Sequence, residues 1–277
     1  MKKNHYGSIS QNNIQNDVER YSEEISIKGF ATVPNLISEE ELEIWRRKID
    51  EIYIKQEESY GKNALLSIDE IDMCRAPLLY DIEFMKLASN PLILQIAKNI
   101  LGSWIILNLQ NAIINRPKQK HHQSSWHRDL PYQNFVISKP LAINALFAID
   151  EFSNETGSTQ VVPYSHRLEV LPSDDFINTN SVDVVMPQGS VVLFDSMIFH
   201  RAGYNNSKIT RRAINHMYTI PLLKQQYDLP RALGGNYSFD REILQLLGYS
   251  SQVPLNEIEW RKNRENKILT QIGSNII

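Results

Sequence analysis

Cysteine is almost absent from this chain of 277 residues, which holds a single one, Cys74. One cysteine cannot form an intramolecular disulfide, so a disulfide framework is excluded and a reducing compartment is favoured. The sequence also lacks any run of about 18 apolar residues, the length that a membrane-spanning helix needs. Its polar start, MKKNHYGSISQNNIQN, has no apolar stretch of a secretory signal. We therefore expect a cytoplasmic protein.

A strong charge of either sign is missing as well. The formal net charge is -3, and no basic arm is present, so nothing favours nucleic acid as a partner. Hydrophobic residues make up 42% of the chain, which is enough for a sizeable core. We expect a monomer or homodimer that acts on a small molecule.

The residue pattern of the chain changes from helical to strand-like and back to helical. No long linker separates these parts, which suggests one domain. Residues 1–17 are polar and are expected to be flexible, whereas 18–277 form the domain. The first hundred residues are mostly helical in pattern. A β core is expected over about 103–222, followed by a helical tail over about 223–277 that is either a lid or a dimer contact.

Two helices are marked by their capping residues. Ser38 with Glu41 three positions later forms a capping box. The helix after it places four apolar residues on one face: Leu42, Trp45, Ile49 and Ile52. A second helix has Asn90 as its cap, Pro91 at its first position and Gly102 as its stop.

The β core is indicated by short segments rich in β-branched and aromatic residues, separated by Pro, Gly, Asn and Asp. These segments are SWIILNLQNAIINRP, PLAINALFAID, GSTQVVPYS, VDVVMPQGSVVLFD and RRAINHMYTIPL. Many short strands with turn signals are typical of a β-sandwich or jelly roll. The predicted fold class is therefore mainly β with helices (α+β), in which helices buttress the β core.

Two side chains that can bind metal stand two positions apart in SSWHRDLPYQ, namely His127 and Asp129. Side chains two positions apart on a strand point to the same face, so we expect both to reach one ion. His200, after the strand-like GSVVLFDSMIF, is the best third ligand among the seven histidines. Two histidines and one carboxylate form a facial triad that suits Fe(II) and leaves three metal positions open.

An arginine, Arg211, follows eleven residues after His200, at the start of another expected strand. A hairpin of that length can return it near His200. A 2-oxo acid would fill two of the open metal positions and O2 the third, and the planar fork of arginine suits the far carboxylate of such an acid. The four residues together therefore predict a chemistry that none of them predicts alone.

Three segments resemble the phytanoyl-CoA dioxygenase family of Fe(II)/2-oxoglutarate oxygenases: WHRD, NETGSTQVVPYSH and GSVVLFDSMIFHRAGYNNSKITRRAI. The resemblance covers residues 25–222, in rough bounds. It implies a double-stranded β-helix (jelly roll, cupin-like) core. It also implies iron on His127, Asp129 and His200, and the distal carboxylate of 2-oxoglutarate on Arg211.

The chain departs from the family pattern at two positions beside these motifs. Tyr164 stands where the family has the glycine of P-G-S-H, and Arg128 where it often has glutamine. Neither is a ligand. Halogenases of the family replace the carboxylate ligand by a small residue, so the intact Asp129 predicts hydroxylation instead. Trp126 is expected to pack behind the ligand segment.

Further residues are predicted near the centre from their polarity alone. Asn144 and Gln110 are amides inside apolar strands, where a buried amide needs partners, and we expect them to contact the cosubstrate. Arg128, Tyr132 and Gln133 flank the ligands in sequence and are candidates for contact with the substrate.

The remaining charged candidates are given structural roles. His121 and His122 are neighbours in a polar loop and cannot easily share one ion, although they could belong to a lid over the substrate. His166 is expected to be structural or to support a ligand, and His216 to lie in the core rather than in the pocket. Arg212 must face away from Arg211 on a strand and is expected to be solvated or in a surface ion pair.

The predicted function is a 2-oxoglutarate oxygenase that hydroxylates an unactivated C–H of a small polar metabolite and releases succinate and CO2. Two alternatives stay open: another cupin-like metalloenzyme (an isomerase or hydrolase) that does not need Arg211, and a non-catalytic relative that binds a small ligand. The basic stretch NRPKQKHH, with Arg128 and Arg201 beside the ligands, favours an anionic substrate.

Overall fold

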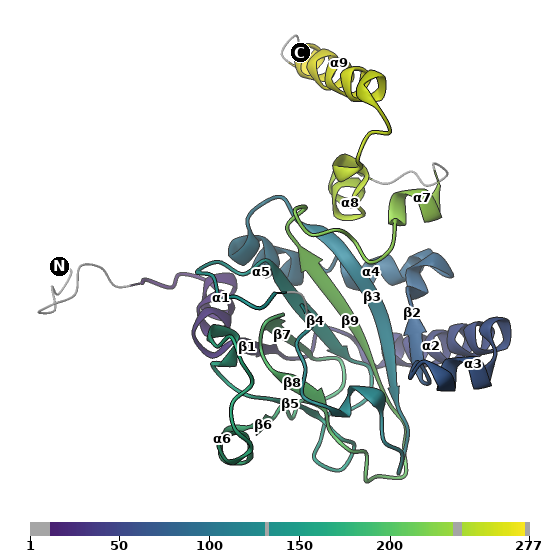
Figure 1. Cartoon of the computed structure of the whole chain (residues 1–277), viewed down its shortest axis with the longest axis vertical. Helices are drawn as coiled ribbons and strands as arrows, with labels where there is room; N and C mark the ends of the chain where they lie inside the picture. Colours follow the sequence, from purple (N-terminus) through teal and green to yellow (C-terminus); the bar gives the residue numbers. More distant parts are fainter. Residues whose placement is uncertain (1–11, 131–132, 235–239, 275–277) are drawn as a thin grey trace, which may run out of the picture.

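The computed structural model describes residues 12–130, 133–234 and 240–274. At the centre of this part of the chain, two antiparallel β-sheets face each other (Figure 1). The larger sheet has the strand order β1 (Phe30–Val33), β7 (Val191–Asp195), β4 (Ala142–Ala148), β9 (Arg211–Thr219), β3 (Ile106–Asn115) and β2 (Met73–Arg75). The smaller sheet has the order β6 (Val182–Asp183), β5 (Thr159–Val161) and β8 (His200–Ala202). The expected jelly roll is confirmed.

Helices and short 3-10 turns surround the sheets. The α-helices are α1 (Asp17–Lys28), α2 (Glu39–Tyr60), α3 (Lys62–Ser67), α4 (Met85–Ala88), α5 (Pro91–Leu101), α6 (Asp174–Asn180), α7 (Leu229–Leu233), α8 (Arg241–Leu246) and α9 (Glu257–Ser274). The 3-10 turns are η1 (Pro77–Leu79), η2 (Ile82–Phe84), η3 (His122–Ser124), η4 (Ser165–Arg167) and η5 (Tyr249–Ser251).

The space between the two sheets is filled by apolar side chains from both. Leu146, Phe194 and Ala213 of the larger sheet belong to one buried cluster with Val161 and Val184 from the side of the smaller sheet. Because side chains alternate along a strand, this inner face carries every second residue of β4, β7 and β9. The metal centre described below lies on the same face.

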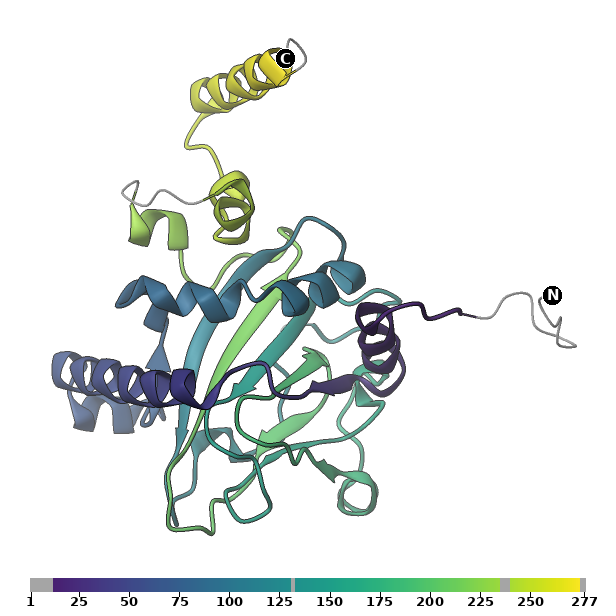
Figure 2. The same cartoon turned by 180° about the vertical axis from the view of Figure 1, so that it is seen from behind.

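The outer face of the larger sheet is covered by the N-terminal helices, which cross it in Figure 2. Ile25 of α1, Ile49 of α2 and Ile96 of α5 pack there with Leu193 and Tyr218 of the sheet. Burial of this outer face against the helices stabilises the sheet. The inner face, between the two sheets, can therefore carry polar groups.

The capping residues predicted from the sequence are confirmed. The Ser38 side chain and the Glu41 side chain cap the start of α2 reciprocally. The Asn90 side chain accepts from the backbone N–H groups of the first turn of α5, and Gly102 ends that helix. Of the segment 1–17 expected to be flexible, residues 1–11 lie outside the described residues, whereas Asn16 caps α1.

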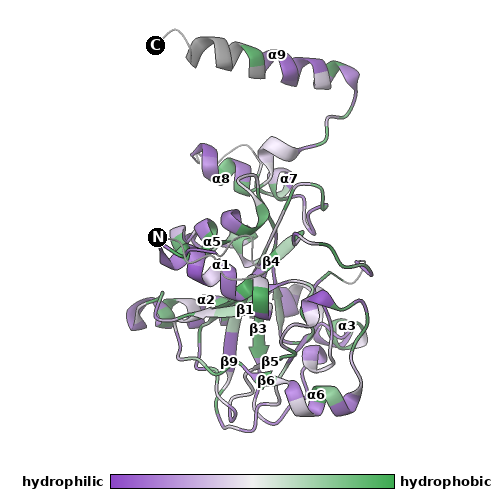
Figure 3. Cartoon of the chain, turned by 90° about the vertical axis from the view of Figure 1, so that its left-hand side faces the viewer, coloured by the Kyte–Doolittle hydropathy of each residue, from purple (hydrophilic) through white to green (hydrophobic). Residues whose placement is uncertain are grey.

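The C-terminal tail divides into two parts. Leu229, Leu233 and Leu246, from α7 and α8, pack on the core cluster that includes the N-terminal helices. By contrast, α9 stands clear of the sheets in two views at right angles (Figures 1 and 3), and the part of it that Figure 3 colours mixes hydrophilic with hydrophobic residues. In the described part of the chain, no helix is long and apolar enough to cross a membrane.

Candidate metal centre

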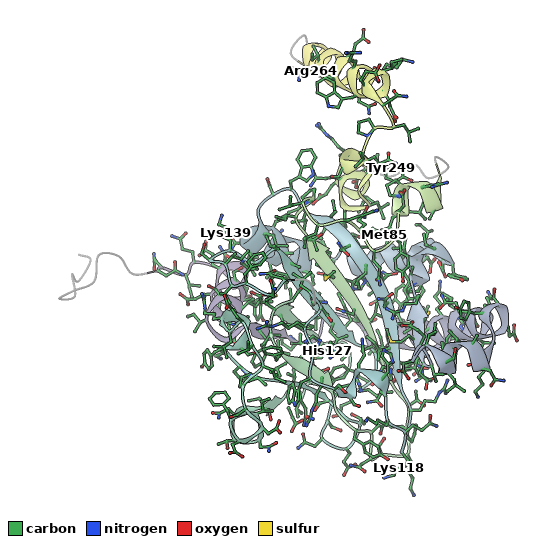
Figure 4. All side chains as sticks on the ribbon, in the orientation of Figure 1. Met85, Lys118, His127, Lys139, Tyr249 and Arg264 are labelled. Atoms are coloured by element: carbon green, nitrogen blue, oxygen red, sulfur yellow. The ribbon has the colours of Figure 1, made fainter. Side chains whose placement is uncertain are left out.

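The predicted triad comes together between the sheets, where Figure 4 labels His127. One ligand atom from each of His127, Asp129 and His200 lies within 4.8 Å of the other two. The Nε2 atoms of His127 and His200 are 3.8 Å and 3.7 Å from Oδ1 of Asp129. Among the described residues, this is the one group of His, Cys, Asp and Glu side chains that could hold a metal ion in this way. The donor set is the two-histidine, one-carboxylate set that suits non-haem Fe(II).

Backbone hydrogen bonds fix where the ligands stand. His127 and His200 form an isolated antiparallel bridge, with N···O distances of 3.0 Å and 3.1 Å. The Asp129 N–H donates to the carbonyl of Ser196 at 3.1 Å. The expectation that His127 and Asp129 lie on a regular strand is wrong. Only His127 pairs with β8, which has three residues and offers no longer stretch for pairing.

Each imidazole is held by a backbone carbonyl on its far nitrogen. Nδ1 of His127 lies 2.8 Å from the Ser125 carbonyl, and Nδ1 of His200 lies 3.1 Å from the Ile198 carbonyl. A carbonyl only accepts, so Nδ1 carries the hydrogen and Nε2 presents its lone pair toward Asp129. Burial lowers the pKa of His200, which favours the neutral ring that a metal requires.

The carboxylate of Asp129 is held by an arrangement that we call the amide clamp, formed by Asn144, Asn215 and Ser196. Nδ2 of Asn144 donates to Oδ2 of Asp129 at 2.7 Å, and Nδ2 of Asn215 approaches the same oxygen at 3.4 Å. Asn144 also donates to Oδ1 of Asn215 at 3.0 Å, and the Ser196 hydroxyl donates to Oδ1 of Asn144. The clamp occupies Oδ2 and leaves Oδ1 facing the histidines.

The clamp corrects the role predicted for Asn144 and adds residues that the prediction missed. Asn144 contacts the ligand Asp129 rather than the cavity beside it. Asn215 was not predicted, yet it lies four positions after Arg211 on β9 and so shares its face. Strand alternation from Arg211 is therefore the signal that could have found it.

Arg211 lies beside the triad, in a small cavity of about 30 Å³ that Thr159 and Asn215 also line. Its side chain is 2% exposed, and its guanidinium lies 4.4 Å from the centre of the Phe152 ring. Nε of Arg211 has no hydrogen-bond partner among the described residues. Burial lowers its pKa to about 10, so it is still a cation at neutral pH. A buried cation without a partner is costly, and an anion entering the cavity would supply one.

Arg212 faces the opposite way, as predicted from strand alternation. Its guanidinium forms ion pairs with Asp50 at 2.8 Å and with Asp150 at 3.0 Å. Asp150 is also paired with Arg46 of α2 at 2.6 Å. Arg212 therefore ties the larger sheet to α2.

Gln110 does not face the metal cavity, so its predicted contact with the cosubstrate is wrong in this structure. It pairs in register with His216 on the helix-covered face of the sheet, and the two side chains lie 2.9 Å apart. Gln110 also donates to the Phe84 carbonyl and accepts from the Leu78 N–H. His216 is fully buried there, as expected for a core histidine.

Arg128 is directed away from the ligands that flank it, so its predicted contact with the substrate is wrong. Its guanidinium donates to the carbonyls of Met197 and Glu169, among others, and lies 3.9 Å from the centre of the Phe199 ring. Arg201 lines the metal cavity, but its Nε donates to Gln160. Arg128 therefore does not support an anionic substrate as the sequence suggested, whereas Arg201 keeps its positive charge at the wall of the metal cavity.

The other candidates beside the ligands have mixed outcomes. Tyr132 lies outside the described residues. Gln133 is buried, and its amide donates to the Phe135 carbonyl, so it is not among the residues that line the metal cavity. Trp126 packs on the outer side of the smaller sheet under Arg201, which agrees with its expected place behind the ligand segment.

Three further histidines stay outside the triad. His166 is buried near the carbonyl of Ser26 at the end of α1, which is a structural position. His121 and His122 lie side by side, with ring centres 4.4 Å apart, next to a second cavity. In the described residues α9 does not cover the triad, because Arg264 of α9 is at the far end of the molecule from His127 in Figure 4.

Comparisons with known proteins agree with this geometry. The sequence model of the family phytanoyl-CoA dioxygenase (PhyH) matches residues 26–213. An uncharacterized protein of Mycobacterium tuberculosis, Rv1501, is 31% identical over 261 residues, which are 91% of this chain and 94% of that protein.

Solved structures with a similar fold are more distant in sequence. The epimerase SnoN in complex with Fe3+, alpha ketoglutarate and nogalamycin RO is 18% identical, with a TM-score of 0.57 over 80% of this chain and 92% of that chain. EctD from S. alaskensis with 2-oxoglutarate and 5-hydroxyectoine is 17% identical, with a TM-score of 0.60 over 76% of this chain and 79% of that chain. At such identities the likeness shows the shared fold, whereas the match to the family model covers most of the chain. The chain therefore belongs to the phytanoyl-CoA dioxygenase family.

Proposed function

We propose that this protein is an Fe(II)- and 2-oxoglutarate-dependent oxygenase that hydroxylates a small polar metabolite. The observation that carries the proposal is the buried guanidinium of Arg211, whose Nε has no partner among the described residues, in the same cavity as the His127, Asp129 and His200 triad. A metal site alone would fit many hydrolases or isomerases. A buried cation beside it fits a cosubstrate that carries a second anionic end.

The residues of the site would share the work as follows. His127, Asp129 and His200 would hold iron through Nε2, Oδ1 and Nε2, the atoms that face one another. Arg211 would hold the distal carboxylate of 2-oxoglutarate and so orient the 2-oxo acid end toward the metal. Iron with 2-oxoglutarate and O2 would supply the oxidation, with release of succinate and CO2.

Hydroxylation is the finer part of the proposal. It is supported by the intact carboxylate ligand Asp129 and by the amide clamp, which occupies its Oδ2. Coordination through Oδ1 alone keeps three metal positions open. One solved structure with this fold is the epimerase SnoN in complex with Fe3+, alpha ketoglutarate and nogalamycin RO, so an isomerising outcome is the alternative. A product that gains one oxygen atom supports hydroxylation, whereas an unchanged mass supports isomerisation.

The test is an anaerobic titration of the purified protein with Fe(II) and then 2-oxoglutarate. We expect a weak visible charge-transfer band, and, in air with ascorbate, release of succinate. His127→Ala should lose the band. His166→Gln is the matched control, because His166 is a buried histidine away from the triad, and it should keep the band.

Two outcomes would contradict the proposal. A wild-type protein that binds Fe(II) but gives no band and no succinate with 2-oxoglutarate would point to another metalloenzyme of this fold. If His127→Ala binds Fe(II) as tightly as the wild-type protein, the assignment of the metal centre to this triad is wrong.

A further inference from the structure

A second cavity lies on the other side of the η3 turn from the metal; we call it the η3 cavity. It is lined by residues that precede β2, by the end of β3 and by residues around η3 and in the segment leading into it. Its volume is about 420 Å³, and the exposed side chains Gln119 and Lys120 form part of its wall, so it opens to solvent. None of the metal ligands lines it.

Only a thin wall separates the η3 cavity from the metal centre. His122 and Ser125 face the η3 cavity, whereas Gln123, between them in sequence, faces the metal cavity. The carbonyl of Ser125 accepts the hydrogen bond from Nδ1 of the ligand His127. Asn115, also in the η3 cavity, is the register partner of Arg211 on the neighbouring strand. Both cavities are therefore built on the same two segments.

Several buried polar atoms of this wall have no hydrogen-bond partner in the part of the chain that the structure describes. They are Oδ1 of Asn115, Nε2 of His121, Nδ1 of His122 and Oγ of Ser124. Buried polar groups are nearly always hydrogen-bonded, and each unpaired one costs about 1 to 3 kcal/mol. A ligand that paired these atoms would therefore stabilise the wall.

The partners of two of these side chains define what the ligand must offer. Nδ1 of His121 accepts from the Gln123 N–H at 3.2 Å, and burial lowers the His121 pKa to about 3, so the neutral ring carries its hydrogen on Nε2. Nδ2 of Asn115 donates to the Gly203 carbonyl at 2.9 Å, so its free Oδ1 is an acceptor. A ligand in this cavity must therefore donate a hydrogen bond to Oδ1 of Asn115, and a hydroxyl group can donate this bond and also accept one from the wall.

The charges around the cavity balance. Arg116 is paired with Asp72 at 2.7 Å, which leaves Lys120 and Asp69 with opposite signs on the exposed rim. A lining of zero net charge gives no compensation for removing a charged ligand from water. This arrangement favours an uncharged ligand over an anionic one.

We propose that the η3 cavity binds the organic substrate of this enzyme, and that this substrate is an uncharged, hydroxyl-rich molecule of the sugar or polyol class. The inference rests on the proposed oxygenase function for the word substrate, but the binding itself does not need iron. Entry of the ligand would shift the η3 wall and pair its polar atoms. That shift would bring the substrate next to His127.

The experiment uses the fact that the single native cysteine, Cys74, is fully buried. Gln119→Cys would be labelled with a bimane fluorophore, and Glu40→Cys on the exposed start of α2 would be the matched control. The probes are uncharged methyl glycosides and inositols, each compared with a carboxylated counterpart such as the methyl glucuronide. We expect saturable fluorescence changes at position 119 with uncharged probes, at least tenfold weaker binding of the carboxylated ones, and no change at position 40.

A second variant tests the wall. His122→Leu, combined with the reporter at position 119, should weaken the binding of the responding probe about tenfold, because one hydrogen-bonding group is lost. Its unfolding midpoint should match that of the labelled protein without the substitution. Equal binding with and without the His122 imidazole would overturn the assignment of the wall atoms.

The remaining outcomes separate this inference from the proposed function. Tighter binding of the carboxylated probes, or no response to any uncharged probe at position 119, would overturn the proposed substrate class. The iron and 2-oxoglutarate band of the unlabelled protein is recorded in parallel. If that band is absent while position 119 responds, the cavity binds its ligand but the oxygenase function fails.

Discussion

Two adjacent arginines on one strand, Arg211 and Arg212, show how differently the two faces of the larger sheet are used. Arg212 points to the helix-covered face and is paired with Asp50 and Asp150. Arg211 points between the sheets, is 2% exposed, and its Nε lacks a partner among the described residues. One cation is paired within the protein, whereas the other lies beside the metal triad, where it could pair with a bound anion.

The same contrast holds for the amides of the sheet. Gln110 uses its side chain on the Phe84 carbonyl and the Leu78 N–H, which join the sheet to the turns η1 and η2. Asn144 uses its side chain on the ligand Asp129. The helix-covered face therefore uses polar groups to stabilise the fold, and the inner face uses them to prepare a site. Exchanging residues on the two faces should separate stability from cofactor binding.

The largest effect is expected from the two arginines. Arg211→Met should weaken 2-oxoglutarate binding about 100-fold, because two charge-assisted hydrogen bonds are worth about 1.5 to 3 kcal/mol each before compensation. It should leave Fe(II) binding intact and should not lower the free energy of unfolding. Arg212→Met should do the reverse and lower that free energy by about 2 to 3 kcal/mol, because Asp150 loses one of its partners. Calorimetric titration and urea unfolding measure the two quantities. Equal losses of 2-oxoglutarate affinity in the two variants would refute the contrast.

A smaller effect is expected from the amide clamp. Asn144→Leu should weaken Fe(II) binding about 10- to 100-fold, because groups that orient a metal ligand typically contribute that much. The measurement is a competition titration against a chelator. Asn108→Leu is the matched control, since Asn108 is a buried amide of β3 that bonds to Thr219 and the Lys224 carbonyl. If both variants bind Fe(II) equally well, Asn144 does not hold Asp129 in place.

The smallest effect on cofactors is expected on the helix-covered face. Gln110→Leu should leave 2-oxoglutarate affinity unchanged and lower the free energy of unfolding by about 1 to 3 kcal/mol, because the buried N–H of Leu78 loses its acceptor. Isothermal calorimetry and urea unfolding test both parts. A clear loss of 2-oxoglutarate affinity would instead support the contact between Gln110 and the cosubstrate that the sequence predicted.

Much of the fold could be predicted because its signals are local. The capping box of Ser38 and Glu41 and the cap at Asn90 depend on residues within one helical turn, and the structure forms both. Strand β9 was expected from its composition, and alternation along it correctly separated Arg211 from Arg212. The shortest strands were harder. β2 was missed because a three-residue strand depends on its partner β3 rather than on its own pattern.

The wrong predictions for Gln110 and Arg128 share one cause. In both cases the sequence did not reveal to which side of the backbone the side chain points. Gln110 follows a register shift in β3 between Leu107 and Leu109, and a shift of one residue exchanges the two faces of a strand. Arg128 stands between two ligands in sequence, but the backbone alternates and turns it to the far side, onto Phe199. Polarity alone cannot report either fact.

The sequence by itself determined the ligand types, their spacing and the arginine that follows them, because these are properties of residues and of short-range periodicity. Only the tertiary structure decided which oxygen of Asp129 is free, which amides hold the other one, and where a second cavity meets the metal centre. These features join segments that are distant in the chain, such as Asn215 of β9 and Asn144 of β4. Such contacts depend on strand register and on the packing of one sheet against the other, which no local pattern specifies.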